Sequence, residues 1–149
     1  MELTYQAAGQ EDIVPICQLS RQLILDYEDM ESIDFPKVMA WVQKKVARSI
    51  QNYTAVFCGG VKAGYYHFYQ NDDGVFEIDD LYIFPEFQNR GIGSQIVRTC
   101  CASVDSPVML YAFSRNKRAI SLYERLGFRV IQTLDNSRCI MQKEKEEIL

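Results

Sequence analysis

The stretch that decides the fold is residues 88–94, which read Gln88-Asn89-Arg90-Gly91-Ile92-Gly93-Ser94. It lies between a segment of strand character, Val75 to Phe84, and an amphipathic helix that we expect from Gly91 to about Val104. The first amides of a helix have no acceptor inside the helix, and glycines let a ligand approach them closely. The segment therefore predicts a pyrophosphate-binding turn, with the arginine and serine as extra donors. The alternative is a tight strand-to-helix turn without a ligand.

Two familiar phosphate turns are excluded. A dinucleotide-binding turn needs a third glycine near position 96 and an acidic residue about twenty positions after the first glycine, where this chain has Ile96 and Tyr111. A P-loop needs Gly-Lys-Ser or Gly-Lys-Thr, which does not follow this turn.

The rest of the chain predicts an α+β fold around a mixed sheet. A strand and helix are expected over residues 3–26, a second helix from Asp34-Pro36, and an antiparallel meander from Tyr53 to Phe84. After the turn we expect a buried strand at 108–113, a helix capped by Asn116, and a final hairpin over residues 128–142 with its turn at 135–136. We find no repeat or long linker, and we expect one domain over residues 1–149.

Two motifs resemble a known family. Asp80-Leu81-Tyr82-Ile83-Phe84-Pro85 followed by residues 88–93 resembles the acetyl-CoA signature of the GCN5-related N-acetyltransferases (GNAT), with the pattern Gln-x-x-Gly-x-Gly. Residues 116–128 resemble the second signature of that family, an Asn-x-x-Ala helix that ends in Tyr-Glu-x-Leu-Gly-Phe. The resemblance implies a mostly antiparallel twisted sheet flanked by helices, in which two splayed parallel strands hold acetyl-CoA.

The same resemblance implies an N-acetyltransferase in which a primary amine attacks the thioester directly within a ternary complex. Acetyl-CoA is the acetyl donor, and no metal is expected. The residues expected to bind the cofactor are Leu81, Tyr82, Ile83, Gln88, Asn89, Arg90, Gly91, Ile92, Gly93, Ser94 and Asn116. A noncatalytic module that binds acetyl-CoA as a sensor is the alternative function.

Two residues are candidates for catalysis. Tyr123 matches a tyrosine of the family's second signature, and its hydroxyl would serve the departing thiolate; it also fits the apolar stripe of its helix. Glu77 stands eleven residues before Gln88, the offset of a catalytic glutamate in some members of the family. Asp79 and Asp80 compete with it for the role of base. Strand alternation puts Glu77 and Asp79 on one face and Asp80 on the other.

Acidic residues between the first two helices suggest the acceptor. Asp29 and Glu31 lie in the acidic stretch 26–34, and with Asp79 they would attract a cationic amine, either a small molecule or a protein lysine or amino terminus. A solvated acidic loop without a ligand is the alternative.

The composition of the chain argues against some classes of binding partner and favours one cellular location. A formal net charge of −4 disfavours a nucleic-acid partner, and no apolar run is long enough for a membrane span. Five cysteines without ligand-like spacing, and an amino end without a signal sequence, favour reduced thiols in the cytoplasm. A homodimer formed through an edge strand is left open.

Overall fold

The computed structural model describes residues 2–135 and 137–145, and within them a seven-stranded sheet has the order β1-β2-β3-β4-β5-β7-β6. The strands are β1 (Leu3–Ala7), β2 (Tyr53–Cys58), β3 (Val61–Gln70), β4 (Phe76–Ile83), β5 (Val108–Phe113), β6 (Arg129–Leu134) and β7 (Arg138–Lys143). The α-helices are α1 (Ile13–Tyr27), α2 (Phe35–Ser49), α3 (Ile92–Ala102) and α4 (Lys117–Arg125). The expected α+β fold is confirmed.

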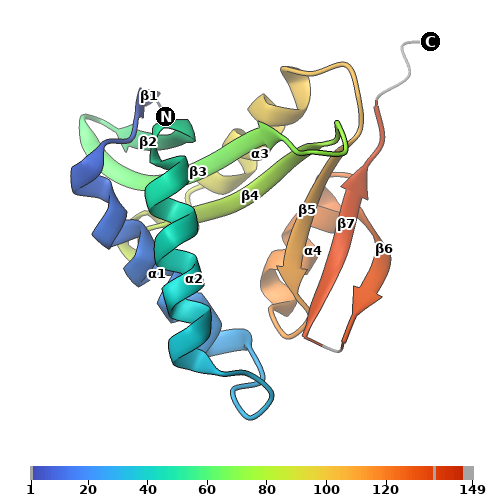
Figure 1. Cartoon of the computed structure of the whole chain (residues 1–149). Coiled ribbons are helices and arrows are strands. Elements are labelled where there is room, and N and C mark those ends of the chain that lie inside the picture. Colours follow the sequence, from blue (N-terminus) through green and yellow to red (C-terminus); the bar gives the residue numbers. More distant parts are fainter. Residues whose placement is uncertain (1, 136, 146–149) are drawn as a thin grey trace.

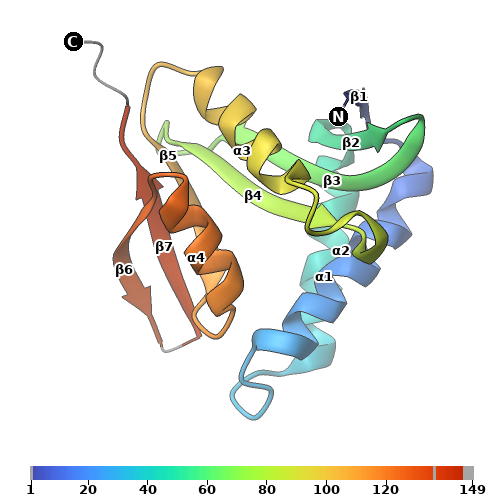
Figure 2. The same cartoon turned by 180° about the vertical axis from the view of Figure 1, so that it is seen from behind.

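The helices cover both faces of the sheet. Helices α1 and α2 lie in front of it in Figure 1, whereas α3 and α4 lie in front when the molecule is turned by 180° in Figure 2. Each face has its own hydrophobic core: Ile16 of α1 and Val46 of α2 are buried on one side, and Ile92 and Ile96 of α3 on the other. Both faces of the sheet are therefore held by a hydrophobic core, which supports the sheet where its strand pairing is irregular.

Local sequence signals set the ends of two helices. Asp34 precedes α2, and its carboxylate accepts a hydrogen bond from the Lys37 amide at 3.2 Å. Asn116 precedes α4 and accepts from the Ala119 amide in the same way, also at 3.2 Å. Gly127, the second residue after the end of α4, has a φ of 99°, where only glycine is free of strain.

Strands β4 and β5 are parallel but pair over only three residues each. The partners are Phe76 with Val108, Glu77 with Met109, and Ile78 with Leu110. Beyond these pairs the two strands diverge, which opens the sheet into the V seen in Figure 1. The splayed parallel pair expected from the sequence is thus present, and the divergence begins at Asp79.

A bulge in β4 changes the side-chain alternation. The pairing with β3 shifts by one residue, so that Asp79 and Asp80 together stand opposite the single residue His67. Strict alternation predicts Asp80 on the face opposite Asp79, and that prediction is wrong, because Lys45 of α2 contacts both carboxylates.

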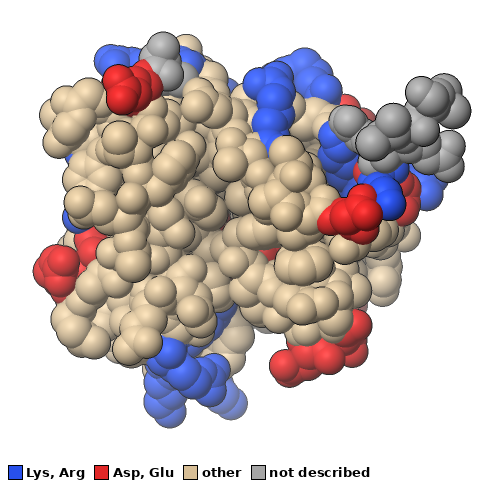
Figure 3. All heavy atoms as spheres, turned by 90° about the horizontal axis from the view of Figure 1, so that it is seen from above, with Lys and Arg blue, Asp and Glu red and all other residues tan. Residues whose placement is uncertain are grey.

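The charged groups of the surface are scattered on the face shown in Figure 3. Lysine and arginine side chains form separate small groups there, with acidic side chains between them and a mostly uncharged centre. Among the described residues, no helix has the length and apolar character needed to cross a membrane.

Candidate active site

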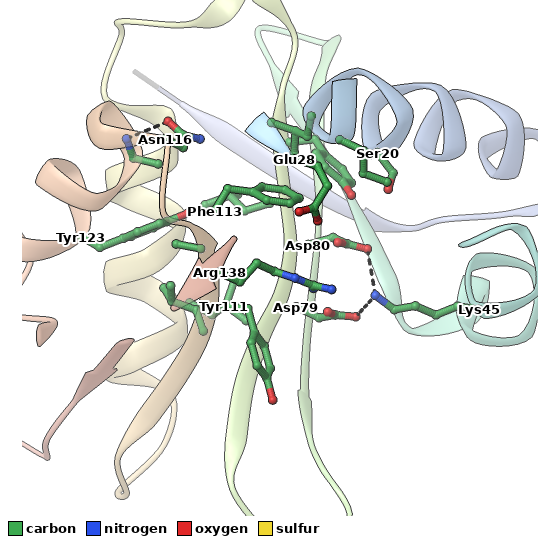
Figure 4. A pocket seen from close by; sticks show the side chains of 18 of the residues that line it. Ser20, Glu28, Lys45, Asp79, Asp80, Tyr111, Phe113, Asn116, Tyr123 and Arg138 are labelled. Atoms are coloured by element: carbon green, nitrogen blue, oxygen red, sulfur yellow. Dashed lines mark hydrogen bonds and ion pairs between the residues drawn. The ribbon is translucent and has the colours of Figure 1, made fainter. Parts of the chain in front are cut away.

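A cavity of about 220 Å³ lies where β4 and β5 diverge. Its walls come from both sides of the V: β4 supplies Asp79 to Tyr82, and β5 supplies Leu110 to Phe113. Figure 4 shows Tyr123 and Asn116 of the α4 region on one side of the cavity and Lys45 of α2 on the other. The tertiary structure therefore brings α2, the second motif and Asp80 to Tyr82 of the first motif together around one space, whereas residues 88–94 do not line it.

The predicted anion-binding turn leads into α3, and the first amides of that helix have no acceptor within it. The first hydrogen bond of α3 runs from the Gln95 amide to the Gly91 carbonyl at 3.0 Å, so the amides of residues 92–94 come before it. Within the described residues no side chain caps this helix end. Three free amides at a positive helix end are suited to a phosphate group.

The two glycines of the turn have different roles. Gly91 has a φ of 79°, a left-handed conformation that strains any other residue. Gly93 has ordinary helical geometry, but a Cβ built on it would meet no atom within 4 Å. The space above Gly93 is open, as a cradle for a ligand requires.

The neighbours of these glycines shape the turn. Asn89 also has a left-handed backbone, with φ 64°, and the Gln88 side chain donates to the Ile83 carbonyl at 3.0 Å, which ties the turn to the end of β4. The Arg90 guanidinium lies 5.2 Å from the centre of the Phe87 ring and is exposed to solvent. Leu81 and Ile83 pack into the core on the α3 side, as expected for strand residues that offer only their backbone to a ligand.

Tyr123 lies on α4 and lines the cavity, together with Asn116 at the start of the same helix. Burial raises the pKa of Tyr123 to about 12. The hydroxyl therefore keeps its proton at neutral pH and is available as a hydrogen-bond donor.

Asp79 and Asp80 share one cation on the opposite wall. The Lys45 ammonium lies 2.5 Å from an Asp79 oxygen and 3.6 Å from an Asp80 oxygen, and Tyr53 donates its hydroxyl to Asp80 at 2.5 Å. Burial alone would raise the pKa of Asp79, but the His67 imidazole and the Lys45 ammonium outweigh it and lower that pKa. Asp79 is thus an ionised, paired carboxylate, which makes it a poor proton acceptor.

Glu77 is a better proton acceptor. Its residue is only 5% exposed, and burial, followed by the nearby charge of Asp79, raises its pKa. The Asn71 amide donates to its carboxylate at 3.4 Å. Glu77 does not line the cavity of the V but a second, larger cavity of about 660 Å³, to which Asp79 also contributes.

The two cavities are neighbours. Lys45, Asp79, Tyr111 and Arg138 line both of them. Figure 4 shows the Arg138 side chain extending toward Asp79 and Asp80 at this boundary, with the Tyr111 side chain below it. The first cavity thus contains Tyr123 and the second contains Glu77, with a shared wall between them.

The acidic loop after α1 contributes fewer residues to the two cavities than its charge suggests. Asp29 closes a local turn, in which it accepts from the Ser32 hydroxyl at 2.7 Å, and Glu31 is exposed. Neither residue lines the two cavities, whereas Glu28 lines the first. The role of Asp29 and Glu31 in acceptor binding stays a prediction.

Sequence reasoning missed four residues of this region: Lys45, Arg48, Tyr111 and Arg138. They come from α2, β5 and β7, outside both motifs, and nothing in their sequence positions marks them as neighbours of Asp79. One local signal existed for α2, because Trp41, Lys45 and Arg48 are spaced four and three residues apart and so share a helix face.

Comparison with known proteins agrees with this geometry. The sequence pattern of the acetyltransferase (GNAT) family matches residues 19–128, which run from α1 to the end of the second motif. The chain belongs to the GNAT family. This GNAT chain is also 32% identical over 66 residues to thialysine N-epsilon-acetyltransferase of Bos taurus, a match that covers 42% of this chain and 39% of the relative. The match therefore spans only about two fifths of that enzyme.

Solved structures share the fold at low sequence identity. PaiA N-acetyltransferase from Thermoplasma acidophilum, in complex with coenzyme A, superimposes with a TM-score of 0.68 at 20% identity, over 97% of this chain and 99% of that one. A putative acetyltransferase from Salmonella typhimurium, with its cofactor acetyl-CoA, gives a TM-score of 0.61 at 20% identity, over 100% and 97% of the two chains. The GNAT fold of this chain is therefore shown.

Proposed function

We propose that this GNAT chain transfers an acetyl group from acetyl-CoA to a primary amine by direct attack in a ternary complex. Two observations carry the proposal: Tyr123 lines the cavity at the V between β4 and β5, and the uncapped α3 turn follows β4, to whose last residue the Gln88 side chain is hydrogen-bonded. Acetyl-CoA supplies a thioester carbonyl that an amine can attack. The remaining requirements fall to this chain's own residues.

The residues of this chain fit acetyl-CoA. The free amides of residues 92–94 and the open space above Gly93 would hold the pyrophosphate, with Arg90 as a nearby cation. The backbone of residues 81–83 borders the V after its pairing with β5 has ended, and main-chain donors there would stabilise negative charge on the carbonyl oxygen. Asn116 lines the same cavity beside them.

Tyr123 would donate a hydrogen bond to the departing sulfur. A phenol with a pKa of about 12 is a weaker acid than a thiol, whose reference pKa is about 8.5. Complete proton transfer to the thiolate is therefore unfavourable, and the hydroxyl acts by stabilising negative charge.

Glu77 would accept the proton of the attacking amine. Its raised pKa brings a carboxylate closer to the range in which a general base is effective near neutral pH. Glu77, which has no cation paired with it among the described residues, also offers a negative charge to a cationic amine at this cavity wall. The relative from Bos taurus is named for an amine acceptor, thialysine, which supports an amine as the acceptor class here.

The test is steady-state acetylation of an amine panel, followed by release of free thiol. We expect Tyr123→Phe to lower kcat about 10- to 100-fold with little change in coenzyme A affinity. Glu77→Gln should lower kcat/KM. The difference in kcat/KM between wild type and variant should be greatest above the pH at which wild-type activity rises. Unchanged kcat in both variants would remove these residues from the mechanism.

The same panel tests the sensor alternative. Binding of acetyl-CoA without turnover on any amine would favour a noncatalytic module, whereas absence of acetyl-CoA binding would overturn both functions. Calorimetric titration of coenzyme A into the folded protein separates these outcomes.

A further inference from the structure

The second cavity has an unusual mixture of charges. Among the described residues, its charged lining comprises three cations and three anions: Lys45, Arg48, Glu77, Asp79, Asp135 and Arg138. Its volume of about 660 Å³ can take a small ligand. A lining without net charge is poorly suited to a ligand that carries only positive charge.

The inner wall carries the negative charge. Glu77 is 5% exposed on β4, and His67 beside it is 4% exposed, stacked between Tyr53 and Tyr69 at centroid distances of 4.6 and 4.5 Å. Its Nδ1 lies 3.4 Å from an Asp79 oxygen, whereas Nε2 has no hydrogen-bond partner among the described residues. Buried polar atoms are normally paired, so Nε2 is a polar atom of this wall with which a ligand could pair.

The cations of the lining are not equivalent. Lys45 is neutralised by Asp79 and Asp80. Arg138 is exposed and, like Arg48, has no ion pair with another described residue, but it lies 5.8 Å from the centre of the Phe113 ring and also borders the first cavity. Arg48 lies one helical turn beyond Lys45, is exposed, and forms no ion pair with any described residue.

We infer that the second cavity binds the acceptor as a molecule carrying both an amine and an anionic group, with the amine toward Glu77 and the anion on Arg48. A guanidinium can hold a carboxylate or phosphate through two parallel hydrogen bonds, which gives it an advantage over a lysine for this task. This inference rests on the proposed function, because it assigns the acceptor of the same reaction.

The test uses substrates that differ only in the anion. We choose amino acids from 3-aminopropanoate to 6-aminohexanoate, together with lysine, and the matching carboxamides of each. Wild-type protein should prefer at least one acid over its amide by about tenfold in kcat/KM. Arg48→Gln should remove that preference by raising KM for the acid, while KM for the amide and for acetyl-CoA stays unchanged.

Lys44→Gln is the matched control, since Lys44 is an exposed cation of the same helix that lines neither cavity. It should keep the preference. Equal kcat/KM for every acid and its amide in the wild type, or a preference that survives Arg48→Gln, would overturn the inference.

A binding measurement separates this inference from the proposed function. Acid and amide are titrated calorimetrically into protein saturated with coenzyme A, which requires no turnover. Tighter binding of the acid that is lost in Arg48→Gln supports the inference even if no amine is acetylated. Absence of binding by both ligands overturns it, whatever the activity.

Discussion

Residues only two positions apart in this chain differ in backbone geometry and in protonation. Gly91 and Gly93 lie two positions apart, yet one is needed for its left-handed backbone and the other for the space above it. Glu77 and Asp79 also lie two positions apart and have opposite pKa shifts, because Lys45 pairs with Asp79 while burial dominates at Glu77. We therefore propose different roles for such neighbouring positions.

Gly93→Ala should separate binding from folding. The new Cβ meets no protein atom and replaces glycine in a helix, so the free energy of unfolding should stay the same or rise by roughly 0.5–1 kcal/mol. The methyl group fills the proposed pyrophosphate cradle, so coenzyme A affinity measured by calorimetry should fall about tenfold. Gly91→Ala is the control, and it should destabilise the fold by roughly 1–2 kcal/mol, because its φ is 79°. Unchanged affinity in Gly93→Ala would contradict the assigned cradle.

Glu77 should leave a signature in the pH dependence of stability. A carboxyl whose folded pKa is raised binds its proton more tightly in the native state, so it stabilises the fold below the unfolded pKa of about 4.5. That stabilisation is lost as the pH rises through the folded pKa. Glu77→Gln should therefore flatten this decline, so that the variant gains stability relative to wild type between acid and neutral pH. Urea denaturation across this range is the measurement, and parallel curves for the two proteins would refute the raised pKa.

At the scale of elements, one lysine of α2 holds a strand that is irregular. The bulge in β4 turns two consecutive carboxylates toward α2, and Lys45 neutralises both. Without this cation, two largely buried negative charges would face each other at the opening of the V. The contact between α2 and β4 thus stabilises the backbone that we assign to the thioester.

Lys45→Met should therefore cost about 3 kcal/mol of unfolding free energy, because removal of one partner leaves buried charges uncompensated. The deficit should shrink as the pH falls through the lowered pKa of Asp79, since a protonated carboxyl no longer needs the cation. Lys44→Met on the exposed side of the same helix should change stability by no more than about 0.5 kcal/mol. Equal stability of the two variants in denaturant titrations would show that the ion pairs contribute little.

For the molecule as a whole, ligand binding and folding are linked. Coenzyme A at a hundred times its Kd should add about 2.7 kcal/mol to the unfolding free energy. For a chain of 149 residues this corresponds to a rise in Tm of roughly 5–10 °C. Pantetheine, which lacks the pyrophosphate, should produce a much smaller rise at the same concentration, and Gly93→Ala should reduce the effect of coenzyme A. A thermal scan in which neither ligand shifts Tm would contradict the binding site.

The sequence by itself was sufficient for the α+β class, the helix caps at Asp34 and Asn116, and the glycine turn before α3, because these depend on residues close together in the chain. The family resemblance also came from two local motifs, and the family match confirms it. The side of the sheet on which Asp80 lies could not be predicted, since the bulge follows from how β4 pairs with β3. The grouping of Lys45 with Asp79, and the second cavity beside Arg48 and Arg138, likewise arose only from tertiary structure. Local hydrogen bonding leaves a signature within a few residues, whereas the packing of α2 and β7 against β4 depends on contacts between distant segments.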